Sequence, residues 1–162
     1  MGIVDYFQFC AFVYCWWVPI GNGIQKRIMT NQQLLLVKRT WKLLREVDPT
    51  LLGDVFYGRL FMQHPGCRAL FTGPMESQYR KFTDMLSILV SRLDQPGAVA
   101  QEIRHLAIRH QGYGVKPHHY EPVREALLWT LEQGLGNDWN QAVREAWVAC
   151  YDALTRLMLE AS

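Results

Sequence analysis

The chain has few of the features that hold metal clusters or covalent frameworks. Its four cysteines are Cys10, Cys15, Cys67 and Cys150, and no two of them form a CxxC pair. This spacing argues against a disulfide framework and a thiolate zinc site, and indicates a reducing compartment. No CxxCH motif is present, so any haem would be bound without thioether bonds. We therefore expect a cytoplasmic protein with reduced thiols.

The sequence also lacks a strong charge of either sign. Its formal net charge is +2, and 49% of its residues are hydrophobic. This balance gives no reason to expect nucleic acid as a partner. A chain of 162 residues is long enough for one domain with a core and a ligand cavity.

Residues 1–28 differ from the rest of the chain. Phe7 to Ile20 is apolar and aromatic, without helical periodicity, and is shorter than the roughly 20 apolar residues that a membrane-spanning helix needs. It also makes a poor signal peptide, because Asp5 precedes it and no lysine or arginine does. Three interpretations of this extension stay open: an interfacial anchor giving peripheral membrane association, a partner-binding arm, and residues upstream of the natural start.

A helical domain is predicted over residues 29–162. Thr30 and Gln33 follow Met29 in a capping-box pattern, which marks the start of a helix. No later segment alternates with period two for long enough to form a strand. Apolar stripes at helical spacing recur instead, over 34–44, 52–60, 82–93, 99–113, 123–131 and 143–157, with one short turn at 67–71. Because these helices differ in length, we expect irregular crossings rather than a symmetric bundle.

One histidine lies within an apolar helical stripe. Val99, Ile103, Leu106, His110 and Tyr113 are spaced 4, 3, 4 and 3, which places them on one face of a helix. A buried imidazole needs a hydrogen-bond partner or a metal, because an unpaired buried polar group is costly. The spacing alone is compatible with a core histidine whose ring is hydrogen-bonded and with a histidine that binds a metal.

The other four histidines are poorer ligand candidates. His105 lies off the stripe and is expected in solvent, and His64 lies at a helix end where terminal carbonyls can bind it. His118 and His119 flank a turn and are expected to be exposed. None of them has the i, i+4 pairing that a zinc site would show.

The order of these elements and of several residues within them resembles the globins. The likeness is strongest to bacterial single-domain globins and to the haem domain of flavohaemoglobins, with some similarity to neuroglobin. It covers nearly all of residues 30–160 and is carried by Trp41, Phe56, Tyr57, Pro65, Phe71, Gln78, Lys81, Phe82, His110, Val115, Tyr120 and the segment AWVACY.

The resemblance implies an all-α globin fold, a three-over-three helical sandwich around one non-covalent b-type haem. His110 matches the proximal histidine that ligates the iron, and its apolar face would then pack on the porphyrin. Tyr120 matches a proximal tyrosine that helps to orient this histidine. A glutamate that accompanies it in flavohaemoglobins has no clear counterpart, since Glu160 does not fall at its place. The walls of the haem pocket are expected to include Phe71, Phe82, Leu86, Leu106 and Val115.

The resemblance also assigns residues to the distal side of the haem, opposite His110. Tyr57 matches a distal tyrosine of oxygen-avid bacterial globins, and Gln78 matches the distal position that is a histidine in many animal globins. Both side chains can donate hydrogen bonds to dioxygen, which gains negative charge when bound. Lys81 is expected to contact a haem propionate or solvent, with binding to the iron as the alternative.

We therefore expect reversible, high-affinity dioxygen binding, with nitric oxide and carbon monoxide as further ligands. Nitric oxide detoxification would need a separate reductase, because the chain contains no G-x-G-x-x-G motif. The alternative is a membrane-associated haem redox or gas sensor in which a side chain fills the sixth iron site.

Overall fold

A computed structural model describes residues 17–20, 24–27 and 29–161 of the chain. Residues 29–161 form six α-helices: α2 (Asn31–Leu44), α3 (Pro49–Gln63), α4 (Met75–Ser91), α5 (Pro96–Gly112), α6 (Tyr120–Leu135) and α7 (Gln141–Glu160). Short 3₁₀ helices η1 (Pro65–Leu70), η2 (Pro117–His119) and η3 (Gly136–Asp138) lie between them. The prediction of six helices and one short turn near residue 67 is confirmed.

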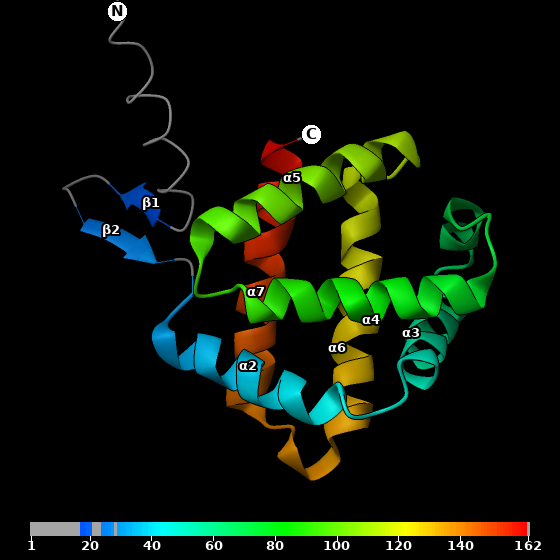
Figure 1. Ribbon diagram of the computed structural model, residues 1–162, viewed down its shortest axis with the longest axis horizontal. Helices are drawn as coiled ribbons and strands as arrows, with labels where there is room; N and C mark the ends of the chain where they lie inside the picture. Colours follow the sequence, from blue (N-terminus) through cyan, green and yellow to red (C-terminus); the bar gives the residue numbers. More distant parts are fainter. Residues whose placement is uncertain (1–16, 21–23, 28, 162) are drawn as a thin grey trace, which may run out of the picture.

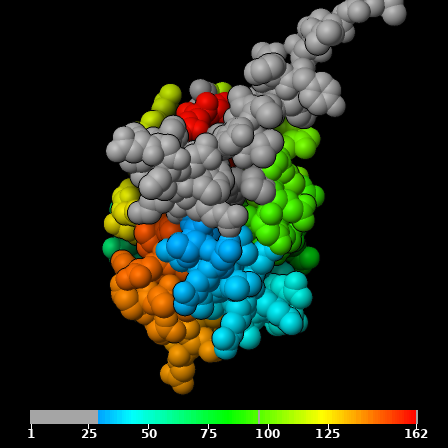
Figure 2. Space-filling view, turned by 90° about the vertical axis from the view of Figure 1, so that its left-hand side faces the viewer, coloured from blue at the N-terminus to red at the C-terminus, as the bar shows by residue number. Residues whose placement is uncertain are grey.

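The helices form two layers that cross (Figure 1). Helices α2, α4 and α5 lie across α6 and α7, and α3 packs against both α4 and α6. Helix α2 also contacts α7 and α4, and Figure 2 shows it at the surface between these two parts of the chain. This arrangement is the three-over-three sandwich that the sequence predicted.

Part of the N-terminal extension forms a hairpin. Strands β1 (Trp17–Ile20) and β2 (Ile24–Arg27) pair antiparallel, with Trp17 opposite Arg27 and Ile20 opposite Ile24. These strands were not predicted from the sequence. The apolar residues 7–16 lie outside the described residues, so the three interpretations of the extension stay open. Among the described residues, no helix combines the length and apolar character needed to cross a membrane.

Helix starts follow the local sequence signals. The Thr30 hydroxyl accepts a hydrogen bond from the Gln33 backbone N–H, and the Gln33 side chain accepts one from the Thr30 N–H. This confirms the predicted capping box. The Asp48 carboxylate accepts from the Thr50 N–H at 2.7 Å, and Pro49 occupies the first position of α3. A proline there is favourable because the first helical N–H has no partner within the helix.

A glycine allows α3 and α4 to cross closely. A Cβ atom added at Gly53 would lie 2.4 Å from Cβ of Tyr79, closer than real atoms approach. The crossing brings the Tyr79 hydroxyl to Asp54 Oδ1, to which it donates at 2.9 Å. Gly53 therefore sets the distance between the two helices that carry the predicted distal residues.

Two tryptophans connect α2 to the helices around it. Trp147 is 1% exposed and donates its indole N–H to the Thr40 hydroxyl at 3.0 Å, entirely within the core. Trp41 meets the Trp147 ring edge to face, with centroids 6.1 Å apart, and donates to Ser87 on α4. These contacts hold α2 against α7 and α4 and satisfy both indole donors.

Candidate functional site

His110 lies near the C-terminal end of α5 with its ring held by the backbone. Nδ1 lies 3.0 Å from the carbonyl oxygen of Leu106, one turn earlier. A carbonyl only accepts, so Nδ1 carries the proton and donates it. This tautomer leaves Nε2 with a lone pair, and Nε2 has no hydrogen-bond partner among the described residues.

The surroundings of His110 favour the neutral ring. Burial lowers the pKa of the imidazole below its ordinary value of 6.5, and the nearby Arg109 guanidinium lowers it further. The Leu106 carbonyl opposes these effects, but the pKa remains lowered. A neutral imidazole with an available Nε2 is the form that binds a metal.

Two rows of side chains run along the inner side of α5. Val99, Ile103 and Ala107 are almost fully buried, whereas Leu106 and His110 are half-buried. The prediction that Tyr113 belongs to the apolar face of this helix was wrong. The helix ends at Gly112, and Tyr113, which follows it, is 65% exposed.

Aromatic rings from α3 and α4, together with Phe71 directly after η1, form a distal cluster. Tyr57 contacts Phe71 and Phe82 edge to face, with centroids 5.0 and 5.9 Å apart, and also contacts Phe61. Phe82 stacks on Phe56 at 4.0 Å. Tyr57 therefore contacts two other residues, Phe71 and Phe82, that the sequence predicted for the walls of the pocket.

The Tyr57 side chain is buried, and its hydroxyl has no hydrogen-bond partner among the residues that the structure describes. The residue is 6% exposed, and its hydroxyl makes no hydrogen bond within the described part of the chain. Burial raises the pKa of the phenol to about 12, with a smaller contribution from Tyr79. Tyr57 is thus a protonated, unused donor inside an apolar cluster.

The remaining distal residues lie on α4. Gln78 is half-buried in the first turn, and its Nε2 would lie 3.7 Å from a Cβ atom added at Gly73. Lys81 is exposed one turn of helix later, and Leu86 is buried.

Val115 and Tyr120 follow the histidine helix. The Val115 N–H donates to the His110 carbonyl at 3.1 Å, which ties the turn after α5 to the histidine. Tyr120 is half-buried at the start of α6, and its backbone carbonyl accepts from the Tyr151 hydroxyl. Within the described residues, the hydrogen bond that orients the His110 ring comes from Leu106. The part in this orientation that the resemblance implies for Tyr120 stays a prediction.

The other histidines lie away from this region or in solvent. His105 and His118 are exposed as predicted, while His119 is half-buried and its Nδ1 accepts from the Lys116 N–H. His64 does not bind terminal carbonyls. Its Nε2 lies 3.1 Å from the Glu125 carboxylate on α6.

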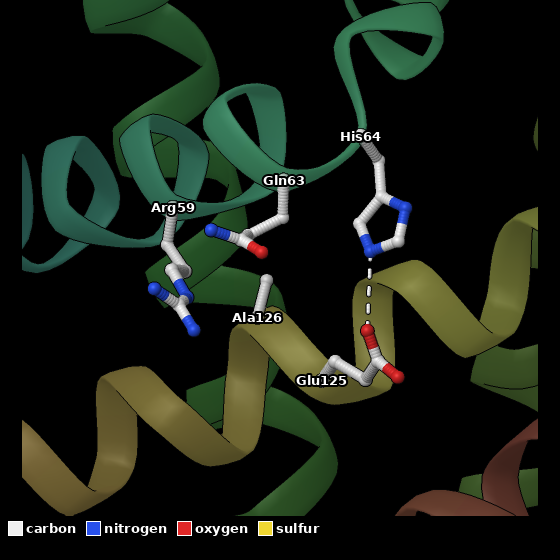
Figure 3. A pocket seen from close by; sticks show the side chains of 5 residues that line it. All are labelled: Arg59, Gln63, His64, Glu125 and Ala126. Carbon is white, nitrogen blue, oxygen red and sulfur yellow. Dashed lines mark hydrogen bonds and ion pairs between the residues drawn. The ribbon is translucent and has the colours of Figure 1, made fainter.

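A small pocket surrounds His64 and Glu125 (Figure 3). Its volume of about 40 Å³ holds a water molecule or two and is far too small for a haem. Its walls are polar side chains and one alanine, Arg59, Gln63, His64, Glu125 and Ala126. Among the described residues, no three His, Cys, Asp or Glu side chains gather as a metal site would require.

The donor set on α3 and α5 fits a haem. On α5, one neutral imidazole offers Nε2 beside the half-buried Leu106. On α3, a buried phenol offers an unused O–H. A single-histidine ligand and an apolar wall with one donor suit iron in a porphyrin, not a structural metal ion.

Comparison with known proteins finds similar sequences among flavohemoproteins and nitrite reductases. The flavohemoprotein of Xylella fastidiosa (strain Temecula1) is 31% identical over 128 residues, which cover 77% of this chain and 32% of that protein. The chain thus spans about a third of the flavohemoproteins it matches. An anaerobic nitrite reductase of Arabidopsis thaliana is 29% identical over 77% of this chain and 88% of its own length.

A solved structure shares the fold. It is an engineered carbene transferase made from a Rhodothermus marinus protein named as a nitric oxide dioxygenase. It is 28% identical, with a TM-score of 0.73 over 80% of this chain and 90% of its own. The Globin family model matches residues 54–158, more than half of the chain. The chain therefore belongs to the globin family.

Proposed function

We propose that the protein binds dioxygen reversibly and tightly at a non-covalent haem b held by His110. When bound, the haem supplies an iron centre that coordinates diatomic gases. The observation that carries the proposal is the pair of prepared groups, the His110 Nε2 and the unpartnered Tyr57 hydroxyl.

Residues of this chain are assigned to the proximal and distal sides of the haem. The Leu106 carbonyl fixes the His110 ring and its tautomer, so that Nε2 is directed away from the helix backbone. The half-buried Leu106, Val115 and Tyr120 are assigned to the proximal wall, and Phe71, Phe82 and Leu86 to the distal wall. These apolar side chains exclude water.

Tyr57 is the principal donor on the distal side. Its hydroxyl stays protonated near neutral pH because the pKa of the phenol is about 12. Gln78 is the second donor, and Lys81 is assigned to a propionate or to solvent. A donor in an apolar cluster interacts strongly with a ligand that gains negative charge.

The assignment of His110 is tested by absorption spectroscopy. The wild-type protein loaded with haem is expected to show a strong Soret band, and His110→Gly is expected to lose haem and to regain a five- or six-coordinate spectrum when imidazole is added. His105→Gly, an exposed position on the same helix, is the matched control and should keep the wild-type spectrum. A wild-type spectrum in His110→Gly without imidazole would refute the assignment.

Nitric oxide detoxification is a second candidate function. It is favoured by the flavohemoprotein relatives and by the name of the Rhodothermus marinus protein. A reductant from outside residues 29–161 would have to restore ferrous iron. Catalytic consumption of nitric oxide with a generic reductase would support this activity, whereas a single turnover would leave the protein as an oxygen carrier.

A further inference from the structure

The end of α5 and the residues after it carry a local excess of positive charge, because they contain no acidic residue. Residues 103–120 contain three of the 17 lysines and arginines, four of the five histidines and none of the 15 acidic residues. The chain has a formal net charge of +2, so its other residues sum to −1. The segment comprises most of α5, the turn after it, η2 and the first residue of α6, all at one corner of the molecule (Figure 1).

Two large apolar side chains lie exposed among these cations. Ile108 is 58% exposed and Tyr113 is 65% exposed. Arg109 and Lys116 are exposed beside them in the sequence and make no ion pair within the described residues. An exposed tyrosine next to an arginine is typical of interaction surfaces, where these residue types contribute most to binding.

Acidic side chains at the borders of the segment are paired elsewhere. Arg124 binds both Glu121, at 2.5 Å, and Asp152, at 3.2 Å. Glu102 pairs with Arg92. These carboxylates therefore do not neutralise Arg109 and Lys116, whose charges remain available to a partner.

We propose that this corner docks an acidic electron-transfer protein that reduces the haem iron. The proximal basic surface comprises His105, Ile108, Arg109, Tyr113, Lys116 and His118. The inference rests on the proposed function. One electron leaves the reduced partner and converts ferric to ferrous iron, and no bond is formed or broken.

The position of the surface favours an electron donor over a lipid surface. Arg109 is covalently adjacent to His110, and Val115 donates to the His110 carbonyl. A partner seated here lies next to the residue assigned to the iron. A small patch with a few charges and two apolar side chains also suits the weak, brief encounters of redox proteins.

The test is binding of a plant-type [2Fe–2S] ferredoxin, an acidic one-electron donor, measured by calorimetry at low salt. We expect Arg109→Glu/Lys116→Glu to weaken binding at least tenfold. The matched control is Arg39→Glu/Lys42→Glu on α2, which reverses two exposed charges and alters net charge equally. It should change the dissociation constant less than threefold. Wild-type binding should also weaken steeply as salt is raised, as electrostatic association does.

A second pair of variants tests the apolar contacts. Ile108→Ser is expected to weaken ferredoxin binding at least threefold. Leu35→Ser, at a residue of similar exposure on α2 (64%), should have no effect. Reduction by dithionite, which needs no docking, should proceed at wild-type rate in all four variants, while reduction by ferredoxin should slow in the two docking variants.

Each outcome decides the inference. Equal weakening by both charge reversals, or binding to phosphatidylserine vesicles without binding to ferredoxin, would overturn it. The calorimetric readout needs no haem. Absence of a Soret band would refute the proposed function. Ferredoxin binding to that haem-free chain, and its loss in Arg109→Glu/Lys116→Glu, would still test the docking surface.

Discussion

Replacing Tyr57 with phenylalanine tests the distal assignment most directly. The substitution removes one oxygen atom from a residue that is 6% exposed and leaves the ring contacts with Phe71 and Phe82 in place. Because the hydroxyl has no partner among the described residues, its loss breaks no hydrogen bond within that part of the chain. The change therefore isolates the effect of the donor on a bound ligand.

The expected magnitude follows from the burial of the donor. A hydrogen bond to a charged or partly charged acceptor away from water contributes about 1.5–3 kcal/mol. Since about 1.4 kcal/mol corresponds to a factor of ten, dioxygen should dissociate roughly 10- to 150-fold faster from Tyr57→Phe. The wild-type rate should be nearly constant from about pH 6 to 9, because the pKa of the phenol is about 12.

The assay is stopped-flow displacement of dioxygen by carbon monoxide. Tyr79→Phe is the matched control, because its hydroxyl is already used by Asp54 and its ring contacts Tyr57 at 5.7 Å. It should change the dissociation rate less than threefold. A rate in Tyr57→Phe within threefold of wild type would refute the role of the hydroxyl.

The same variant makes a prediction about stability. An unsatisfied buried hydroxyl destabilises the folded state, so its removal from the haem-free protein should leave the free energy of unfolding unchanged or raise it by about 1 kcal/mol. Urea denaturation measures this. A decrease of more than about 1 kcal/mol would mean that the hydroxyl has a partner in the fold, contrary to the reasoning.

Three further predictions concern packing and pH. Gly53→Ala should lower the unfolding free energy by about 1–3 kcal/mol because its Cβ would overlap α4, whereas Gly58→Ala, with nothing within 4 Å, should raise it by up to about 1 kcal/mol; thermal denaturation compares them. Trp147→Phe should cost about 2–3 kcal/mol, since it leaves a cavity and removes the buried bond to Thr40; urea titration checks the loss. Because the pKa of His110 is lowered in the folded state, the folded protein is favoured fully above pH 6.5 and loses stability as the pH falls through the lowered pKa. Haem should therefore be released faster below about pH 6, as measured by transfer to apomyoglobin. A release rate independent of pH would contradict this.

The elements that the sequence predicted well depend on neighbours close in the chain. The Thr30–Gln33 capping box involves residues within one turn of each other. Such contacts follow from backbone geometry alone. The buried Val99–Ile103 face of α5 follows from helical period in the same way.

The sequence failed where distant residues or irregular backbone decided the outcome. Tyr113 continues the period of α5, but the helix ends at Gly112 and the chain turns its side chain into solvent. His64 and Glu125 are 61 residues apart, so no local pattern could pair them. The acceptor of the His110 Nδ1–H is the backbone carbonyl of Leu106, which residue type does not reveal, although its i−4 position relative to the histidine could have suggested it.

The polar groups on the two sides of the candidate site differ in how many hydrogen bonds the folded chain provides for them. On α5, the chain provides His110 with one hydrogen bond and keeps its second nitrogen neutral and available. On α3, it buries the Tyr57 hydroxyl among aromatic rings and provides no acceptor within the described residues. The neighbouring Phe56 shows that a plain phenyl ring packs at 2% exposure in the same cluster, so filling space does not require the oxygen. The folded chain gains nothing from this hydroxyl unless a ligand accepts its hydrogen bond, so the proposed tightness of dioxygen binding depends on Tyr57, whereas the proposed binding of the haem depends on His110.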